Sequence, residues 1–360
     1  MIRFIHLADV HLGAVPDRGC PWSSQREEEI WDTFRRVIAS VSKNPVELLF
    51  IAGDLFHRQP LKRELKEVNY LFSTIPDTQV FLMAGNHDAI SRESFYRDYP
   101  WAPNVTFFQT ETPETVQAPG LPVYVTGFSY HRREIREPLY DSLTPGPEEG
   151  FHVLLAHGGD ENHIPMDKLA LASSGFDYIA LGHIHMPQAV IRDKMVYPGA
   201  LEPIDRGDMG PHGYVEGSCE NGKVQTRFVP FASRSYKKLV LELGEESTQF
   251  SLEEQMKTAL LKDGGQDIYR VVLQGVHAPD TMIFPEKLKL LGNVVEILDE
   301  TRPAYDLEAL RKRYSGTLAG DYIAHFTGRT LSLTEEKALY YGLRALLEAG
   351  TSAGTLLQQT

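Results

Sequence analysis

Apolar and polar positions over the first 90 residues alternate between strand-like and helix-like spacing. Apolar runs at residues 2–8, 46–52 and 79–84 predict three strands, each of which leads into a polar turn. Between these runs, residues 23–43 and 61–75 place apolar side chains on one stripe at helical spacing. This β-α-β-α-β order predicts a parallel sheet that is covered by helices.

Shorter apolar runs continue to about residue 230, where the pattern changes. Strands are expected at residues 105–108, 123–127, 151–156, 177–181, 189–192 and 195–197, followed by a hairpin over 213–230. Residues 237–298 then alternate strand and helix, and residues 306–360 are helical and polar. We therefore expect an α/β protein with a first domain over 1–233, a small α+β capping domain over 234–303 and a helical C-terminal segment over 304–360.

Composition restricts the classes of function. The chain has 360 residues with 36 basic and 49 acidic side chains, a net charge of -13, which argues against holding DNA or an anionic membrane by bulk charge alone. Only 2 cysteines occur, so a disulfide framework or a cysteine-based zinc site is excluded and a reducing, cytoplasmic compartment is expected. A charged start excludes a signal peptide, and no apolar run approaches the ~18 residues of a membrane span.

Five short polar segments lie at or near predicted strand ends: Asp9-Val10-His11, Gly53-Asp54, Gly85-Asn86-His87-Asp88, His157-Gly158 and Gly182-His183-Ile184-His185. Ligand sites of open α/β sheets gather at this edge. Alternation places both side chains of Asp-x-His and His-x-His on one face, and the glycines let the backbone approach an ion without a Cβ clash. Singly, each segment is compatible with a turn or a structural histidine. Together, their oxygen and nitrogen donors favour Mn²⁺, Fe or Zn²⁺ over Ca²⁺ or Mg²⁺.

In this order, the five segments resemble the pattern of the calcineurin-like metallophosphoesterase superfamily, over residues 1 to about 230. The stretches Ile5–Gly13 and Ala52–His57 are similar, more narrowly, to SbcD/YhaO-type DNA double-strand-break-repair exonucleases. The resemblance implies a four-layer α-β-β-α sandwich followed by the small capping domain and the helical segment.

The resemblance also implies two divalent metal ions, with Mn²⁺ favoured and Fe or Zn as alternatives. It assigns ligand roles to seven residues: Asp9, His11 and His185 for the first ion, Asp54 as the bridge, and Asn86, His157 and His183 for the second. His87 would face the scissile phosphate and Asp88 would orient His87. His57 matches a phosphate-side histidine of some relatives. These three residues are the catalytic candidates.

The implied function is hydrolysis of DNA by a Mn²⁺-dependent 3′→5′ exonuclease, with endonuclease capacity, in DNA repair. The resemblance implies that the C-terminal helices either dock on an SbcC-like ABC-type ATPase with a coiled coil or pack on their own domain. A homodimer is an open alternative for the assembly. The alternatives are a phosphodiesterase or phosphatase for a small molecule or protein, and a regulatory scaffold for an ATPase. Arg132, Arg133 and Arg136 form a basic segment that is either a DNA contact or a solvated helix start.

Overall fold

A computed structural model describes residues 1–357, without the side chains of 263, 333 and 350–357, so the last three residues of the expected C-terminal segment lie outside it. The chain divides into two compact units. Unit 1 contains residues 1–237 and 266–268, and unit 2 contains the remaining residues from 238 onward.

The first sheet of unit 1 has six strands in the order β12-β11-β1-β2-β3-β4. Their bounds are β1 Ile2–Leu7, β2 Leu48–Ala52, β3 Gln79–Met83, β4 Val105–Phe108, β11 Gly213–Glu220 and β12 Lys223–Pro230. Strands β1 to β4 are parallel, and β11 pairs antiparallel with β1. The parallel arrangement expected for the first three strands is therefore confirmed.

The second sheet also has six strands, in the order β5-β6-β7-β8-β10-β9. Their bounds are β5 Glu114–Gln117, β6 Val123–Gly127, β7 Phe151–His157, β8 Tyr178–Gly182, β9 Gln188–Ile191 and β10 Met195–Tyr197. Strands β6, β7 and β8 run parallel to one another, so the carboxyl ends of β7 and β8 lie at one edge.

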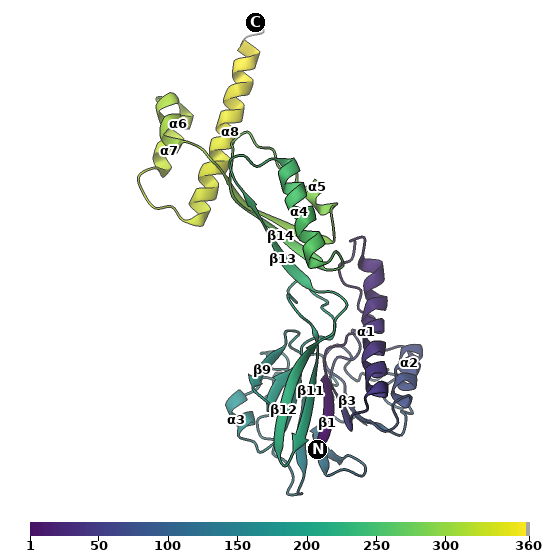
Figure 1. Cartoon of the computed structure of the whole chain (residues 1–360). Helices are drawn as coiled ribbons and strands as arrows, with labels where there is room; N and C mark the ends of the chain where they lie inside the picture. Colours follow the sequence, from purple (N-terminus) through teal and green to yellow (C-terminus); the bar gives the residue numbers. More distant parts are fainter. Residues whose placement is uncertain (358–360) are drawn as a thin grey trace. The chain divides into compact units, whose positions relative to one another are not determined.

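Alternation along the strands builds the layers. In β1, Phe4 packs between the two sheets with Phe50 of β2, whereas Ile5 and Leu7 face the opposite side. That side is covered by α1 (Ser23–Lys43) and α2 (Lys62–Ser73), which lie beside each other on one flank of the sheet (Figure 1). The outer face of the second sheet is covered by α3 (Lys168–Ala172) and irregular segments. The result is the expected four-layer α-β-β-α sandwich.

Unit 2 combines a three-stranded sheet with helices. Its elements are β13 Tyr236–Leu243, α4 Gln249–Asp263, β14 Ile268–His277, α5 Pro285–Lys289, β15 Val294–Pro303, α6 Leu307–Arg313, α7 Leu318–Phe326 and α8 Leu333–Leu357. Leu252 and Met256 of α4 pack against Leu241 of β13 and Leu273 of β14 in a separate apolar core. Across residues 1–357, no helix has the length and hydrophobicity that crossing a membrane requires.

Candidate metal centre

Strand ends of both sheets deliver the candidate side chains. In the first sheet, Asp9 and His11 follow β1, Asp54 follows β2 and Asn86 follows β3. In the second sheet, the last residue of β7 is His157, and β8 is followed at once by His183 and then by His185. The structure brings all seven of these residues together, as the distances below show.

A first group of donors surrounds the imidazole of His11. Its Nε2 lies 3.1 Å from Nε2 of His185 and 4.0 Å from Oδ1 of Asp9. One donor atom from each of these three residues lies within 4.8 Å of the others. Two imidazole nitrogens at hydrogen-bond distance can share only one proton, and a cation between them would use both lone pairs.

A second group surrounds His157. Its Nε2 is 2.9 Å from Oδ1 of Asn86, and Nδ1 of His183 is 3.1 Å from the same oxygen. Oδ2 of Asp54 lies 3.4 Å from Nε2 of His157 and 3.9 Å from Nε2 of His11. Asp54 therefore lies between the two groups, which is where a bridging carboxylate would be required.

The centre carries negative charge in a buried place. Asp9, His11, Asp54 and His157 are at most 1% exposed. Among the described residues, the ion-pair partners of both carboxylates are histidines, with no lysine or arginine. Burial alone would lower the pKa of His157, but the nearby carboxylate of Asp54 raises it to about 9. A buried site that favours positive charge, lined by carboxylate, amide and imidazole donors, fits divalent cations such as Mn²⁺, Fe²⁺ or Zn²⁺.

Backbone strain is concentrated at the same residues. Positive φ values occur at Asp9 (49°), His11 (52°), Asp54 (50°) and His183 (97°), half of all such non-glycine positions in the structure. Left-handed backbone costs a non-glycine residue roughly 1–3 kcal/mol, and such strain accumulates where function requires a particular side-chain direction. The sheet ends are thus bent to aim these four side chains at one point.

Two positions require glycine because neighbouring atoms of the site lie too close to the backbone for a Cβ atom. A Cβ atom on Gly85 would run into the Asp54 carboxylate, and one on Gly182 would run into the carbonyl oxygen of Ala52 and the ring of His157. Glycine before Asn86 and before His183 therefore lets the two sheets and the Asp54 carboxylate come close together, while close approach of the backbone to an ion stays a prediction.

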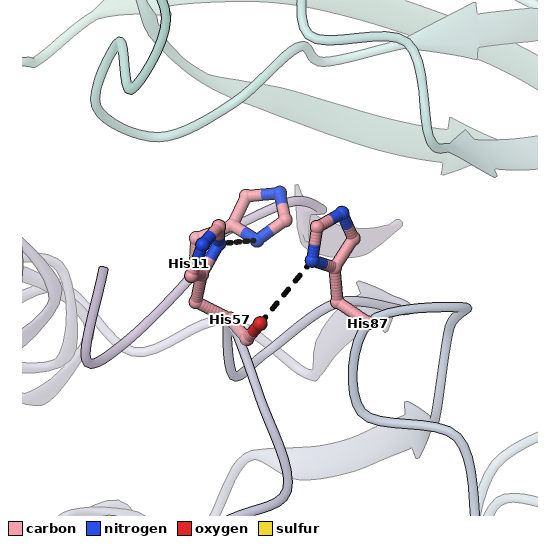
Figure 2. Close-up of side chains that lie close together, drawn as sticks. All are labelled: His11, His57 and His87. Carbon is pink, nitrogen blue, oxygen red and sulfur yellow. Dashed lines mark hydrogen bonds between the residues drawn. The ribbon is translucent and has the colours of Figure 1, made fainter. Parts of the chain in front are cut away.

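His87 and His57 lie beside the metal donors (Figure 2). Their rings stack with centroids 4.9 Å apart, and Nδ1–H of His87 donates to the carbonyl oxygen of His57 at 3.2 Å. Nδ1 of His57 lies 3.4 Å from Nδ1 of His11. Burial and the neighbouring His87 lower the pKa of His57. Both rings are half-buried, so they are open to a ligand that occupies the centre.

Asp88 holds the backbone around the catalytic candidates. Its carboxylate accepts hydrogen bonds from N–H of Gly85 at 2.8 Å, N–H of Phe56 at 3.1 Å and the hydroxyl of Tyr96 at 2.8 Å. Burial raises the pKa of Asp88 to about 7, with the charge of Asp54 adding to the shift. The sequence suggested direct orientation of His87, whereas these bonds tie together the two loops that carry His57 and His87.

Two carboxylates that the sequence did not single out contact the histidines of the last segment. Oδ2 of Asp160 is 2.6 Å from Nε2 of His183, and Oδ2 of Asp208 is 3.2 Å from Nδ1 of His185. Asp160 lies two residues beyond the His157-Gly158 segment and Asp208 lies 23 residues after His185, but neither belongs to a motif pattern that would assign it a role. Their position becomes evident only from the folded loops.

The basic segment is exposed and largely paired. Arg132 forms an ion pair with Glu137 at 2.9 Å, and Arg136 forms one with Glu134 at 3.1 Å. Arg133 is also exposed. The segment is bent and contains no helix, so the expected helix start is not present.

This fold, with a cluster of metal donors at the strand ends of two stacked sheets, defines a metal-dependent phosphoesterase architecture. The sequence profile of the calcineurin-like phosphoesterase family matches residues 2–187, and the chain belongs to this family. The chain is therefore a metallophosphoesterase, a class of hydrolase whose fold binds two divalent metal ions.

Individual relatives are similar over most of the chain. A protein of Bacillus subtilis named uncharacterized metallophosphoesterase YhaO is 28% identical over 323 residues, 83% of this chain and 78% of that protein. The DNA double-strand break repair protein Mre11 of Methanopyrus kandleri is 26% identical over 345 residues, 86% of this chain and 75% of that protein. Mre11 of Methanocaldococcus jannaschii is 28% identical over 220 residues, 58% of each chain.

Proposed function

We propose that this chain is a two-metal phosphodiesterase that hydrolyses DNA, as a Mn²⁺-dependent 3′→5′ exonuclease with endonuclease capacity in DNA repair. The observation that carries the proposal is the pair of donor groups on either side of Asp54, with two further imidazoles beside them. The similarity to proteins named for DNA double-strand break repair supports DNA as the substrate.

In this proposal each donor group holds one ion. Asp9, His11 and His185 hold the first ion, Asn86, His157 and His183 hold the second, and Asp54 is shared. Bound by these residues, two divalent ions would supply positive charge for a phosphate group and would lower the pKa of a water molecule. The protein contributes a rigid arrangement, because the strained backbone at four of these residues is fixed by the two sheets.

His87 is the proposed proton donor to the leaving oxygen. Its Nδ1–H is bonded to the carbonyl oxygen of His57, so the proton that passes to the leaving oxygen must come from Nε2. His87 would therefore act in its doubly protonated imidazolium form and become neutral on transfer. The stacked ring of His57 limits rotation of His87 and lies on the same side of the centre. The hydrogen bonds from N–H of Phe56 and of Gly85 to Asp88 support a role for Asp88 that acts through the backbone of both loops.

DNA binding would depend on more than this chain. The net charge of -13 predicts weak and salt-sensitive binding by the protein alone. We therefore propose that an SbcC-like ABC-type ATPase with a coiled coil supplies most of the affinity for DNA. Arg132, Arg133 and Arg136 are proposed phosphate contacts. Arg133 is the best candidate for a phosphate contact, because its guanidinium forms no ion pair with any described residue, whereas Arg132 and Arg136 are paired with glutamates.

The experiment compares wild type with His87→Ala. Each protein is incubated with Mn²⁺ and either end-labelled duplex DNA or bis(p-nitrophenyl) phosphate, and bound metal is measured. Wild type should shorten DNA from its 3′ ends. His87→Ala should keep both ions and lose about 10²–10⁴-fold in turnover, since general acid catalysis contributes that much. His277→Ala, in unit 2, is the matched control and should match wild type.

Each other outcome has a defined meaning. Loss of metal from His87→Ala would refute its place outside the ligand set. Turnover of the small ester without shortening of DNA would assign the site to a small-molecule or protein phosphoester. Bound metal with turnover of neither substrate would favour a regulatory scaffold.

A further inference from the structure

We propose that Asp160 is a positioning residue that fixes the tautomer of His183, so that Nδ1 of His183 is unprotonated and available to the second metal ion. This inference rests on the proposed function, because that proposal assigns His183 as a ligand. The two nitrogens of the ring have different neighbours: Nε2 lies 2.6 Å from Oδ2 of Asp160, and Nδ1 lies 3.1 Å from Oδ1 of Asn86.

An ionised carboxylate accepts hydrogen bonds and donates none. The proton of a neutral His183 must therefore reside on Nε2, where Asp160 accepts it. Nδ1 then presents a lone pair toward the amide oxygen of Asn86, which is also a lone-pair donor. Two acceptors at 3.1 Å repel each other unless a cation lies between them, so this geometry is suited to metal binding.

The loop itself holds Asp160 in place. Its Oδ1 accepts hydrogen bonds from N–H of Asn162 at 2.8 Å and N–H of His163 at 2.9 Å. The ring of His163 adds a contact at 2.9 Å from Nδ1 to each carboxylate oxygen. Although the side chain is 45% exposed, these bonds leave it little freedom to turn away from His183.

His185 has the opposite arrangement. Its Nδ1 lies 3.2 Å from Oδ2 of Asp208, and its Nε2 lies 3.1 Å from Nε2 of His11. The two histidines of one motif thus present different ring nitrogens to the centre, and a different aspartate selects the nitrogen for each. Outer-sphere carboxylates of this kind commonly change metal affinity or activity by about 10–100-fold.

The two aspartates should respond differently to amidation. In Asp160→Asn, the amide oxygen keeps the backbone bonds of Oδ1, and the NH₂ group takes the place of Oδ2. A donor then faces Nε2 of His183 and drives its proton to Nδ1. In Asp208, by contrast, Oδ2 alone accepts from His185 and from N–H of Ile204 and Asp205. An amide oxygen can replace it, so Asp208→Asn loses charge but keeps the acceptor.

In the test, metal-free protein is titrated with Mn²⁺, and binding is measured by calorimetry and by electron paramagnetic resonance. The second method distinguishes a coupled Mn²⁺ pair from isolated ions. Asp160→Asn should weaken the second binding step about 10–100-fold and abolish the coupled signal while one ion still binds. Asp160→Ala should weaken it less, since it removes the acceptor without adding a donor. Glu161→Gln, exposed and adjacent, should match wild type.

The order of the variants identifies the mechanism. If Asp160 only supported the loop, alanine would be the more damaging change, because it removes every hydrogen bond of the side chain. Melting of the metal-free proteins reports any such loss of structure. A coupled pair in Asp160→Asn as tight as in wild type would overturn the inference alone. Absence of the pair from wild type would overturn the proposed metal centre as well.

Discussion

The hydroxyl of Tyr96 provides a quantitative test of how the site is held. It donates to Oδ2 of Asp88 at 2.8 Å, and both side chains are 0% exposed. Tyr96→Phe retains the ring and its packing but leaves the carboxylate with the two bonds from Gly85 and Phe56. At a pH above 7, where Asp88 is mostly ionised, a hydrogen bond to this charged group contributes about 1.5–3 kcal/mol, so the free energy of unfolding should fall by about 2 kcal/mol.

Urea and thermal unfolding of the metal-free protein measure this change. For a folded unit of this size, a loss of 2 kcal/mol corresponds to a midpoint lower by about 4–8 °C. Tyr70→Phe removes an equivalent hydroxyl from a side chain that is 68% exposed, and its midpoint should stay at the wild-type value. With Mn²⁺ present, the Tyr96→Phe protein should also hydrolyse bis(p-nitrophenyl) phosphate more slowly than the Tyr70→Phe protein. The reason is that the turn carrying His87 has lost one of the hydrogen bonds that fix Asp88.

A result in which both variants unfold alike would refute this reasoning. It would mean that water or a shift of Asp88 replaces the lost hydroxyl at no cost in free energy. A slower turnover without any loss of stability would instead indicate that the hydroxyl of Tyr96 affects the site through the charge of Asp88 and not through the stability of the loop.

Three further changes have defined outcomes. Gly85→Ala places a methyl group against the Asp54 carboxylate and should weaken binding of both ions at least tenfold, as measured by metal titration; unchanged affinity would contradict the close approach. Burial lowers the pKa of His6 from 6.5 to about 3. Below pH 6.5 the unfolded chain therefore binds a proton that the native chain does not, and the free energy of unfolding should fall by about 2 kcal/mol between neutral pH and pH 5. His6→Gln should lack this component in urea unfolding at the two pH values. Glu202→Gln removes one of the two charge partners of the buried Arg26, at 3.3 Å, and leaves the other, Glu29 at 2.6 Å. It should therefore destabilise unit 1 by about 1–3 kcal/mol in thermal melting, while an unchanged midpoint would show that the pair with Glu202 is dispensable.

Much of the sandwich could be predicted because each layer repeats a simple period. Helix α1 has the bounds expected for residues 23–43, since its apolar stripe is long and continuous. Strand β5 was not predicted. Its residues 114–117 alternate between half-buried and exposed side chains at the edge of the second sheet, and they contain no apolar run. A strand held mainly by backbone pairing leaves little trace in hydrophobicity.

The site likewise has features that the sequence predicts and features that it does not. The order of the motifs predicts the seven candidate ligands, because each lies at or just after the end of a strand that the apolar pattern indicates. The sequence could not show which ring nitrogen of His183 or His185 faces the centre. That choice depends on Asp160 and Asp208, whose positions follow from hydrogen bonds within irregular loops. Such loops have no period from which to infer a conformation.

The division of the proposed ligands between two sheets has a consequence for the newly made chain. The first sheet's share is complete once residue 88 has been synthesised, whereas His183 follows about 95 residues later. At about 5–20 residues per second, that delay is on the order of 5–20 s. During this time each proposed ion has only part of its ligands. The proposed metal pair can therefore assemble only after the donors of the second sheet have been synthesised and have folded against those of the first.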